Sequence, residues 1–223
     1  GTDDQVLFNG RRYRGVLRFF PAADGVGIMV VNVLAVEQYL RGVVPLELGS
    51  GRTAAEQAAA EAQAVAARSY TFVRLAAAGG SAARHANYDL VAGTSDQVYC
   101  GVDAERAFGD AAVAGTAGLV LKYGGRTVDA PYSASCGGES ASADEVWRTG
   151  GAAYLRRVSD RIPGTQRYYC DPAPRFAWTR TLESAELDAA LRQYLRNYVN
   201  VPAAGPGRSP PPPTAPPAPR QKP

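Results

Sequence analysis

The sequence Val-Val-Pro-Leu-Glu-Leu-Gly at residues 43–49, followed by Ala-Glu-Ala-Gln-Ala-Val-Ala-Ala-Arg-Ser-Tyr at residues 60–70, decides the fold. The second stretch lies in an alanine-rich segment without Gly or Pro, which extends from Thr53 to Leu75. Thr53 followed by Glu56 is typical of a capping box at a helix start. The pattern predicts one long helix.

The first stretch contains an acidic residue, Glu47, between two leucines. A short helix is expected over residues 35–41, and Gly42 and Pro45 predict a loop that carries Glu47. A carboxyl group among apolar side chains loses solvation of its charged form, which favours the protonated acid that a departing glycosidic oxygen needs. The alternative for Glu47 is a solvent-facing turn residue or a charge that stabilises the next helix start.

The composition of the 223-residue chain is that of a globular protein, since 46% hydrophobic residues can bury one good core or two small ones. Its 24 basic and 21 acidic residues give a net charge of +3, too weak and dispersed to argue for nucleic acid. No run approaches the length of a transmembrane helix, and residues 1–10 do not resemble a signal peptide. We therefore expect a trimmed chain whose leader and first strands are absent.

Strands are expected before and after the long helix. Asn9-Gly10 predicts a hairpin turn, and residues 27–34 are typical of a strand buried on both faces. A second hairpin is predicted around Gly124-Gly125, and an amphipathic helix is predicted from Ser184. These elements predict an α+β fold in which antiparallel β-hairpins pack around one long central Ala-rich helix, with a loop-borne active-site cleft.

The chain has a compositional break near its C-terminal end. Residues 1–203 are predicted to form one catalytic domain. Residues 204–223 are Pro-rich and apolar-poor, so they cannot bury enough surface to become ordered and are predicted to be a tail or linker.

Three cysteines permit one disulfide and leave one thiol over. Cys136 with Cys170 is the favoured pairing, and Cys100 with Cys136 is the competing one. A disulfide bond of this kind is typical of a secreted domain. The single histidine, His85, and the lack of a Gly-x-Ser-x-Gly frame make a serine or cysteine nucleophile an unfavoured alternative.

Two polar loops follow the long helix, at residues 93–99 and 132–140. The second is dense in small hydroxyl residues and contains paired glycines, which bring backbone donors close to a ligand. A hydrolytic glycosidase would usually need a carboxylate besides Glu47, and the candidates are Asp96, Asp129, Glu139 and Asp144.

The order of these motifs resembles the stage II sporulation protein D family, also called the SpoIID/LytB domain family. The resemblance covers about residues 5–182 and rests on residues 31–48, 62–70, 96–99, 112–123, 132–140, 145–147 and 154–155, with Cys170, Pro174 and Trp178. In that family the catalytic Glu is often followed by Met-Pro, where this chain has Leu48-Gly49.

The resemblance implies a peptidoglycan lytic transglycosylase, which forms 1,6-anhydro-N-acetylmuramic acid ends on glycan strands. For the sporulation protein, these strands are already denuded of stem peptides. The family's general acid and base falls on Glu47. The residues that would support it or bind substrate are Gln63, Arg68, Tyr70, Gln97, Tyr99, Ser133, Ser135, Gly137 and Gly138.

Other members of the family are described as enhancers of a cell-wall amidase, so a non-catalytic wall-binding module is the alternative. Some clostridial members bind zinc through Cys and His in the two loops. The corresponding residues 94–97 and 132–135 lack histidine, so we expect no metal and no other cofactor. The resemblance implies a secreted, periplasmic or cell-envelope protein whose partners are glycan strands and a cell-wall amidase, not nucleic acid.

Overall fold

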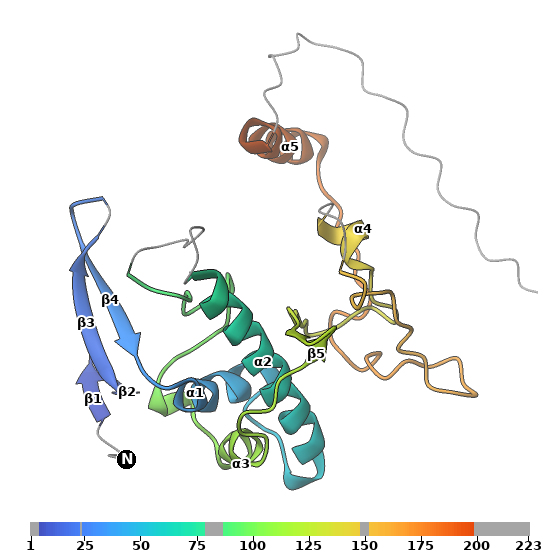
Figure 1. The fold of residues 1–223 in the computed structure, drawn as a ribbon. Coiled ribbons are helices and arrows are strands. Elements are labelled where there is room, and N and C mark those ends of the chain that lie inside the picture. The colour runs from blue at the N-terminus through green and yellow to red at the C-terminus, as the bar shows by residue number, and fades with distance from the viewer. Residues whose placement is uncertain (1–4, 23, 79–86, 148–151, 199–223) are drawn as a thin grey trace, which may run out of the picture. The chain divides into compact units, whose positions relative to one another are not determined.

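The computed structural model has an α+β fold (Figure 1) and describes residues 5–22, 24–78, 87–147 and 152–198. The chain divides into two compact units, Gly1–Phe176 and Ala177–Pro223. Among the described residues, the second unit contains helix α5 (Ser184–Tyr198), which was predicted. The predicted tail at residues 204–223 lies outside the described residues.

The first hairpin forms where Asn9-Gly10 predicted it. Strand β1 (Gln5–Phe8) pairs antiparallel with β2 (Arg11–Arg14), with Phe8 opposite Arg11. The two turn residues have φ angles of 48° and 74°, and positive φ at both central residues is what a type I′ turn requires.

Strand β4 (Ile28–Val33) was expected to be buried on both faces, and this expectation is wrong. It pairs antiparallel with β3 (Val16–Pro21), its side chains are exposed or half-buried, and Ile28 is 72% exposed. Within the described residues this sheet has two strands only, so β4 has a single neighbouring strand.

Helix α1 (Val36–Leu48) extends through the residues expected to form a loop, so Glu47 lies in its last turn and not in a loop. Gly42 faces the Tyr99 ring closely enough that an added Cβ would lie 2.7 Å from it, and Gly109 lies equally close to the Pro45 ring. Gly42 and Pro45 are buried. Close packing with other elements therefore outweighs the helix-breaking tendency of both residues.

Helix α2 (Gln57–Ala78) is the long helix that was predicted, and the short 3₁₀ turn η1 (Ala54–Glu56) precedes it. Half of the expected capping box forms, because the Glu56 carboxylate accepts a hydrogen bond from the Thr53 amide at 3.1 Å. The helix packs against α1 and against α3 (Ala107–Gly115), and its buried alanines permit close approach of these neighbours.

The remaining elements of the first unit are short. They are η2 (Val102–Ala104), α3 (Ala107–Gly115), β5 (Lys122–Tyr123), β6 (Arg126–Thr127) and α4 (Ala143–Trp147). Strands β5 and β6 confirm the hairpin around Gly124-Gly125. The core lies where α1, α2 and α3 meet, and it consists of Tyr39, Leu40, Val43, Val44, Ala60, Ala64, Ala67, Tyr99, Ala112 and Val113.

The prediction of an α+β fold is confirmed, but hairpins packed around one central helix are not. Helix α2 is one of three helices packed together, and the β1–β2 hairpin contacts η2 through β2. Of the named strands, β6 is the one with several contacts to α2.

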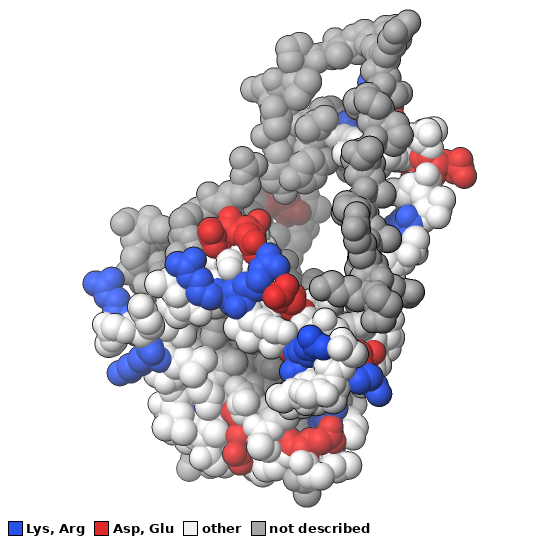
Figure 2. Space-filling model, turned by 90° about the vertical axis from the view of Figure 1, so that its right-hand side faces the viewer, with Lys and Arg blue, Asp and Glu red and all other residues white. Residues whose placement is uncertain are grey.

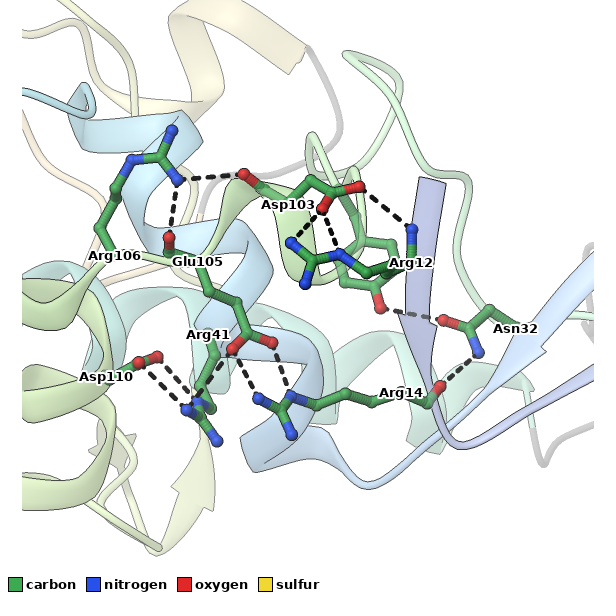
Figure 3. Close-up of polar contacts among 9 residues, drawn as sticks. Arg12, Arg14, Asn32, Arg41, Asp103, Glu105, Arg106 and Asp110 are labelled. Atoms are coloured by element: carbon green, nitrogen blue, oxygen red, sulfur yellow. Dashed lines mark hydrogen bonds and ion pairs between the residues drawn. The ribbon is translucent and has the colours of Figure 1, made fainter. Parts of the chain in front are cut away.

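Ion pairs attach strand β2 to the helices (Figure 3). Arg14 and Glu105 form hydrogen bonds of 2.7 and 2.9 Å, and their side chains are 7% and 9% exposed. Arg41 of α1 joins Glu105 to Asp110 of α3, with its Nε 2.7 Å from the Asp110 carboxylate. Because buried charges are tolerated when they are paired, this network fixes the hairpin to the helical core.

Candidate functional site

Glu47 lies in the wall of a cavity of about 430 Å³. The cavity is built from the end of α1, one residue of α2 and the two polar loops. Its lining residues are Glu47, Leu48, Arg52, Gln63, Thr94, Asp96, Val98, Tyr132, Ser133 and Ala134. The structure thus brings together Glu47, Gln63 and Ser133 of the predicted site residues.

The Glu47 carboxylate is half-buried, and one of its oxygens is held by the first polar loop. Its Oε1 accepts a hydrogen bond of 2.7 Å from the amide of Val98. The loop is closed by backbone bonds from Gly93 to the Gln97 carbonyl and from Asp96 to the Gly93 carbonyl, each 3.1 Å long. Within the described part of the chain, the second carboxylate oxygen of Glu47 has no hydrogen-bond partner.

Gln63 lines the same cavity from helix α2. Its amide nitrogen is buried and has no hydrogen-bond partner among the described residues. An unpaired buried donor is costly, so a buried amide that remains unpaired is suited to a ligand that accepts its hydrogen bond.

Gln97 supports the cavity from behind and is fully buried. Its amide nitrogen donates to the Tyr132 hydroxyl at 3.0 Å and to the Ala67 carbonyl at 3.3 Å. Its amide oxygen accepts from Thr71 at 2.9 Å and from Tyr39 at 3.1 Å. All four hydrogen bonds of this amide are made within the protein, so its evident role is to hold Tyr132 in the cavity wall.

Tyr132 contributes a phenol to the cavity, and its hydroxyl accepts the bond from Gln97. Burial raises the pKa of Tyr132 well above its usual value, and the nearby Glu47 charge raises it further. The phenol therefore stays protonated at neutral pH and can donate a hydrogen bond.

The second carboxylate of the cavity, Asp96, is held by other groups. Its side chain is 5% exposed, Oδ1 accepts from the Tyr70 hydroxyl at 2.9 Å, and Oδ2 accepts from the Val91 amide at 2.9 Å. The Arg74 guanidinium lies 3.9 Å from Asp96 and stacks over the Tyr70 ring at 4.3 Å. Tyr70, a predicted support residue, therefore acts on the cavity through Asp96.

Arg68 does not line the cavity. Its side chain is fully buried, and it donates two hydrogen bonds of 2.8 Å to the Glu37 carboxylate. It also donates to the carbonyls of Leu119 and Val113, at 3.1 and 3.3 Å. The side chain thus joins α2 to α1 and to the end of α3.

Tyr99 also lies outside the cavity. It packs against Tyr39 and Tyr13, and its hydroxyl donates to Asn32 at 2.9 Å. It lines a different and larger cavity, of about 670 Å³, beside β3 and β4.

The second polar loop contributes Ser133 to the cavity lining but not Ser135, Gly137 or Gly138. The Ser135 hydroxyl accepts from the Gly137 amide at 3.3 Å, and Gly138 lies against the Tyr168 ring. Ser135, Gly137 and Gly138 thus belong to the part of the second polar loop that follows the cavity-lining residues.

Arg52 and Thr94 line the cavity but were not singled out in the sequence. Arg52 donates bonds of 3.0 and 2.7 Å to the Leu48 carbonyl, and it pairs with Glu56 at 2.6 Å. A cation just beyond a helix end is a recognisable capping signal. It was missed because α1 was predicted to end before Gly42.

Two of the three cysteines lie together. The sulfur atoms of Cys136 and Cys170 are 3.4 Å apart, and both are free thiols. Cys100 is elsewhere, with the Arg11 guanidinium 3.7 Å from its sulfur. The contact is the one that the favoured pairing requires, and the disulfide itself stays a prediction.

The chain was compared with protein-family models, with curated proteins and with solved structures. Residues 24–123 match the SpoIID family model. Its description is "Stage II sporulation protein", and the matched SpoIID segment contains Glu47, Gln63 and Gln97. The resemblance inferred from the sequence is thereby confirmed over this segment.

Two curated relatives match beyond the SpoIID segment. An uncharacterised protein of Brachyspira hyodysenteriae is 32% identical over 196 residues, which are 86% of this chain and 48% of the relative. A Bacillus subtilis protein named "Amidase enhancer" is 29% identical over 187 residues, 84% of this chain and 23% of the relative. The chain therefore spans about half the length of the first and less than a quarter of the second.

No solved structure shows a significant match to the chain. None of the described helices combines the length and apolar character needed to cross a membrane.

Proposed function

We propose that this chain is a peptidoglycan lytic transglycosylase that cleaves the β-1,4 bond between N-acetylmuramic acid and N-acetylglucosamine. The observation that carries the proposal is the pair formed by Glu47 and Gln63 in one cavity. One carboxylate oxygen and one buried amide nitrogen there have no partner in the described residues. The SpoIID family, which is associated with cell-wall lytic activity, supplies independent support.

Glu47 would act first as acid and then as base. Its protonated carboxyl donates a proton to the glycosidic oxygen, and the bond from that oxygen to the anomeric carbon breaks. The carboxylate then accepts the proton of the sugar's 6-hydroxyl, whose oxygen attacks the anomeric carbon and closes the 1,6-anhydro ring. The bond from the Val98 amide orients the carboxylate for both steps.

Hydrolysis usually needs a second carboxylate that is available to activate water, and the engagement of the other candidate carboxylates favours the lytic reaction. Asp96 is engaged by Tyr70 and the Val91 amide. Glu139, a candidate from the second polar loop, is paired with Arg157 at 3.0 Å and is not among the residues that line the cavity. Both carboxylates are therefore engaged by groups of the protein itself.

Charges of both signs are mixed on one face of the molecule. Figure 2 shows basic and acidic side chains interspersed on the face in view. A mixed surface of this kind creates no broad field of one sign. We therefore expect glycan recognition to rest on hydrogen bonds from Gln63, Tyr132 and Ser133, and we place the protein in the cell envelope or outside the cell.

A second function has its own support, because one relative is named "Amidase enhancer". In that case the cavity would bind glycan without cleaving it, and the chain would stimulate a separate cell-wall amidase. The two functions differ in their dependence on Glu47.

The deciding experiment is mass spectrometry of purified glycan strands, with and without stem peptides, after incubation with wild type and Glu47→Gln. We expect 1,6-anhydro ends from wild type and a loss of at least about a hundredfold in Glu47→Gln, the scale of general acid–base catalysis. Glu61→Gln, on α2 and outside the cavity lining, is the matched control.

Two results would contradict the proposal. Products with water-derived reducing ends would identify a hydrolase. Cleavage of neither substrate by folded protein, together with amidase stimulation that survives Glu47→Gln, would establish the enhancer function instead.

A further inference from the structure

Three potential metal ligands converge outside the Glu47 cavity. They are the thiols of Cys136 and Cys170 and the carboxylate of Asp160, and their donor atoms all lie within 4.8 Å of one another. All three residues are partly exposed. Cys136 follows the cavity-lining Ser133 by three positions, while the other two donors come from a later segment.

A backbone hydrogen bond holds two of these donors together. Asp160 accepts a bond of 2.8 Å from the Cys170 amide, which joins the two residues. Gly137 and Gly138 have φ angles of 69° and 99°, so glycines permit the backbone turn that follows Cys136.

The surrounding segment is weakly stabilised by burial. Among its described residues, from Ser133 to Phe176, the regular element is the five-residue helix α4, and only Gly138 and Ala143 are buried. Irregular segments with little core are commonly held together by a metal or a disulfide.

We propose that, in the reduced protein, Cys136, Cys170 and Asp160 bind a divalent cation of the Zn²⁺ class. Zn²⁺ accepts both thiolate and carboxylate ligands, and two thiolates select against Mg²⁺ and Ca²⁺. Binding releases the two thiol protons to solvent, and a water molecule completes a four-coordinate site. The sulfur separation of 3.4 Å is close to the roughly 3.8 Å that two Zn–S bonds of about 2.3 Å require in a tetrahedron.

Asp160 is the feature that favours a cation over a disulfide alone. A disulfide uses two sulfur atoms and gains nothing from a carboxylate within reach of both. A bound cation would instead use all three groups. The site is independent of the reaction at Glu47, and it would fix the end of the second polar loop.

The test is titration of the fully reduced, full-length chain with Co²⁺ and then Zn²⁺ under anaerobic conditions. We expect about one equivalent to bind, a thiolate-to-Co²⁺ charge-transfer band in the near ultraviolet, and loss of that band when Zn²⁺ displaces Co²⁺. Cys136→Ser and Cys170→Ser should abolish the band, and Asp160→Asn should weaken binding at least about tenfold.

Matched variants separate ligation from general damage to the fold. Cys100→Ser and the exposed Asp144→Asn should bind as wild type does, and circular dichroism should show that every variant is folded. No charge-transfer band in the reduced wild type, or a band that survives loss of both Cys136 and Cys170, would overturn the site. Unchanged affinity in Asp160→Asn would overturn the assignment of the carboxylate.

Discussion

At the scale of single residues, two glutamines show that the same side chain can serve opposite purposes. Gln97 is fully buried and makes all its hydrogen bonds within the protein, whereas the buried amide nitrogen of Gln63 makes none with described residues. The energetic consequences of losing the two amides must therefore differ.

We predict that Gln97→Leu lowers the free energy of unfolding by about 1–3 kcal/mol, because it leaves several buried partners unsatisfied. Gln63→Leu should leave it unchanged or raise it by up to about 1 kcal/mol, yet weaken glycan binding about tenfold. Urea unfolding and glycan-binding titrations would measure both effects. A loss of stability in Gln63→Leu as large as that in Gln97→Leu would show that Gln63 is structural and not ligand-binding.

At the scale of elements, the buried Arg68 joins α2 to α1 through Glu37. Burial opposes ionisation of Glu37, but the hydrogen bond and charge of Arg68 outweigh it and lower the pKa of Glu37. A carboxyl whose pKa is lowered on folding contributes stability above its unfolded pKa, about 4.3, and loses it as the pH falls through the lower folded value.

We predict that Glu37→Gln destabilises the protein by about 1–3 kcal/mol at pH 7, because Arg68 loses its counter-charge. This is less than for a fully buried pair, since the Glu37 side chain is 41% exposed. The difference between variant and wild type should shrink as the pH falls below about 4.3. Denaturant unfolding from pH 7 to pH 3 measures this difference in the free energy of unfolding, with Glu61→Gln as control. A difference that stays constant with pH would exclude the ion pair as its cause.

At the scale of the whole molecule, every residue that lines the Glu47 cavity belongs to the unit Gly1–Phe176. The core at α1, α2 and α3 and the three proposed metal ligands belong to the same unit. The domain boundary predicted from composition, at residue 203, marks where the chain becomes proline-rich, and it stays a prediction.

We predict that a variant ending at Phe176 unfolds in one cooperative transition within about 1 kcal/mol of the full chain, since its core is intact. Its glycan-cleaving rate should lie within about twofold of the full chain. Thermal unfolding and the product assay test this. Loss of the cooperative transition would show that Ala177–Pro223 contributes to the fold of the first unit.

Features that depend on neighbours in sequence were determined by the sequence alone. The Asn9-Gly10 turn, the helix after Thr53 and the α+β class follow from turn chemistry, capping and periodicity, which act within a few residues. The prediction that Glu47 is the catalytic residue also came from the sequence, from its apolar neighbours and the family resemblance, and it stays a prediction.

Features that depend on contacts between distant residues were decided by the tertiary structure. Packing of Gly42 against Tyr99 keeps α1 helical through Glu47, against the local propensity of Gly and Pro. Arg68 is buried and pairs with Glu37, and Asp160 lies beside two cysteines, because of partners that are 10 to 34 residues away in sequence. Burial and ion pairing depend on which surfaces meet, and that is established only when the whole chain has folded.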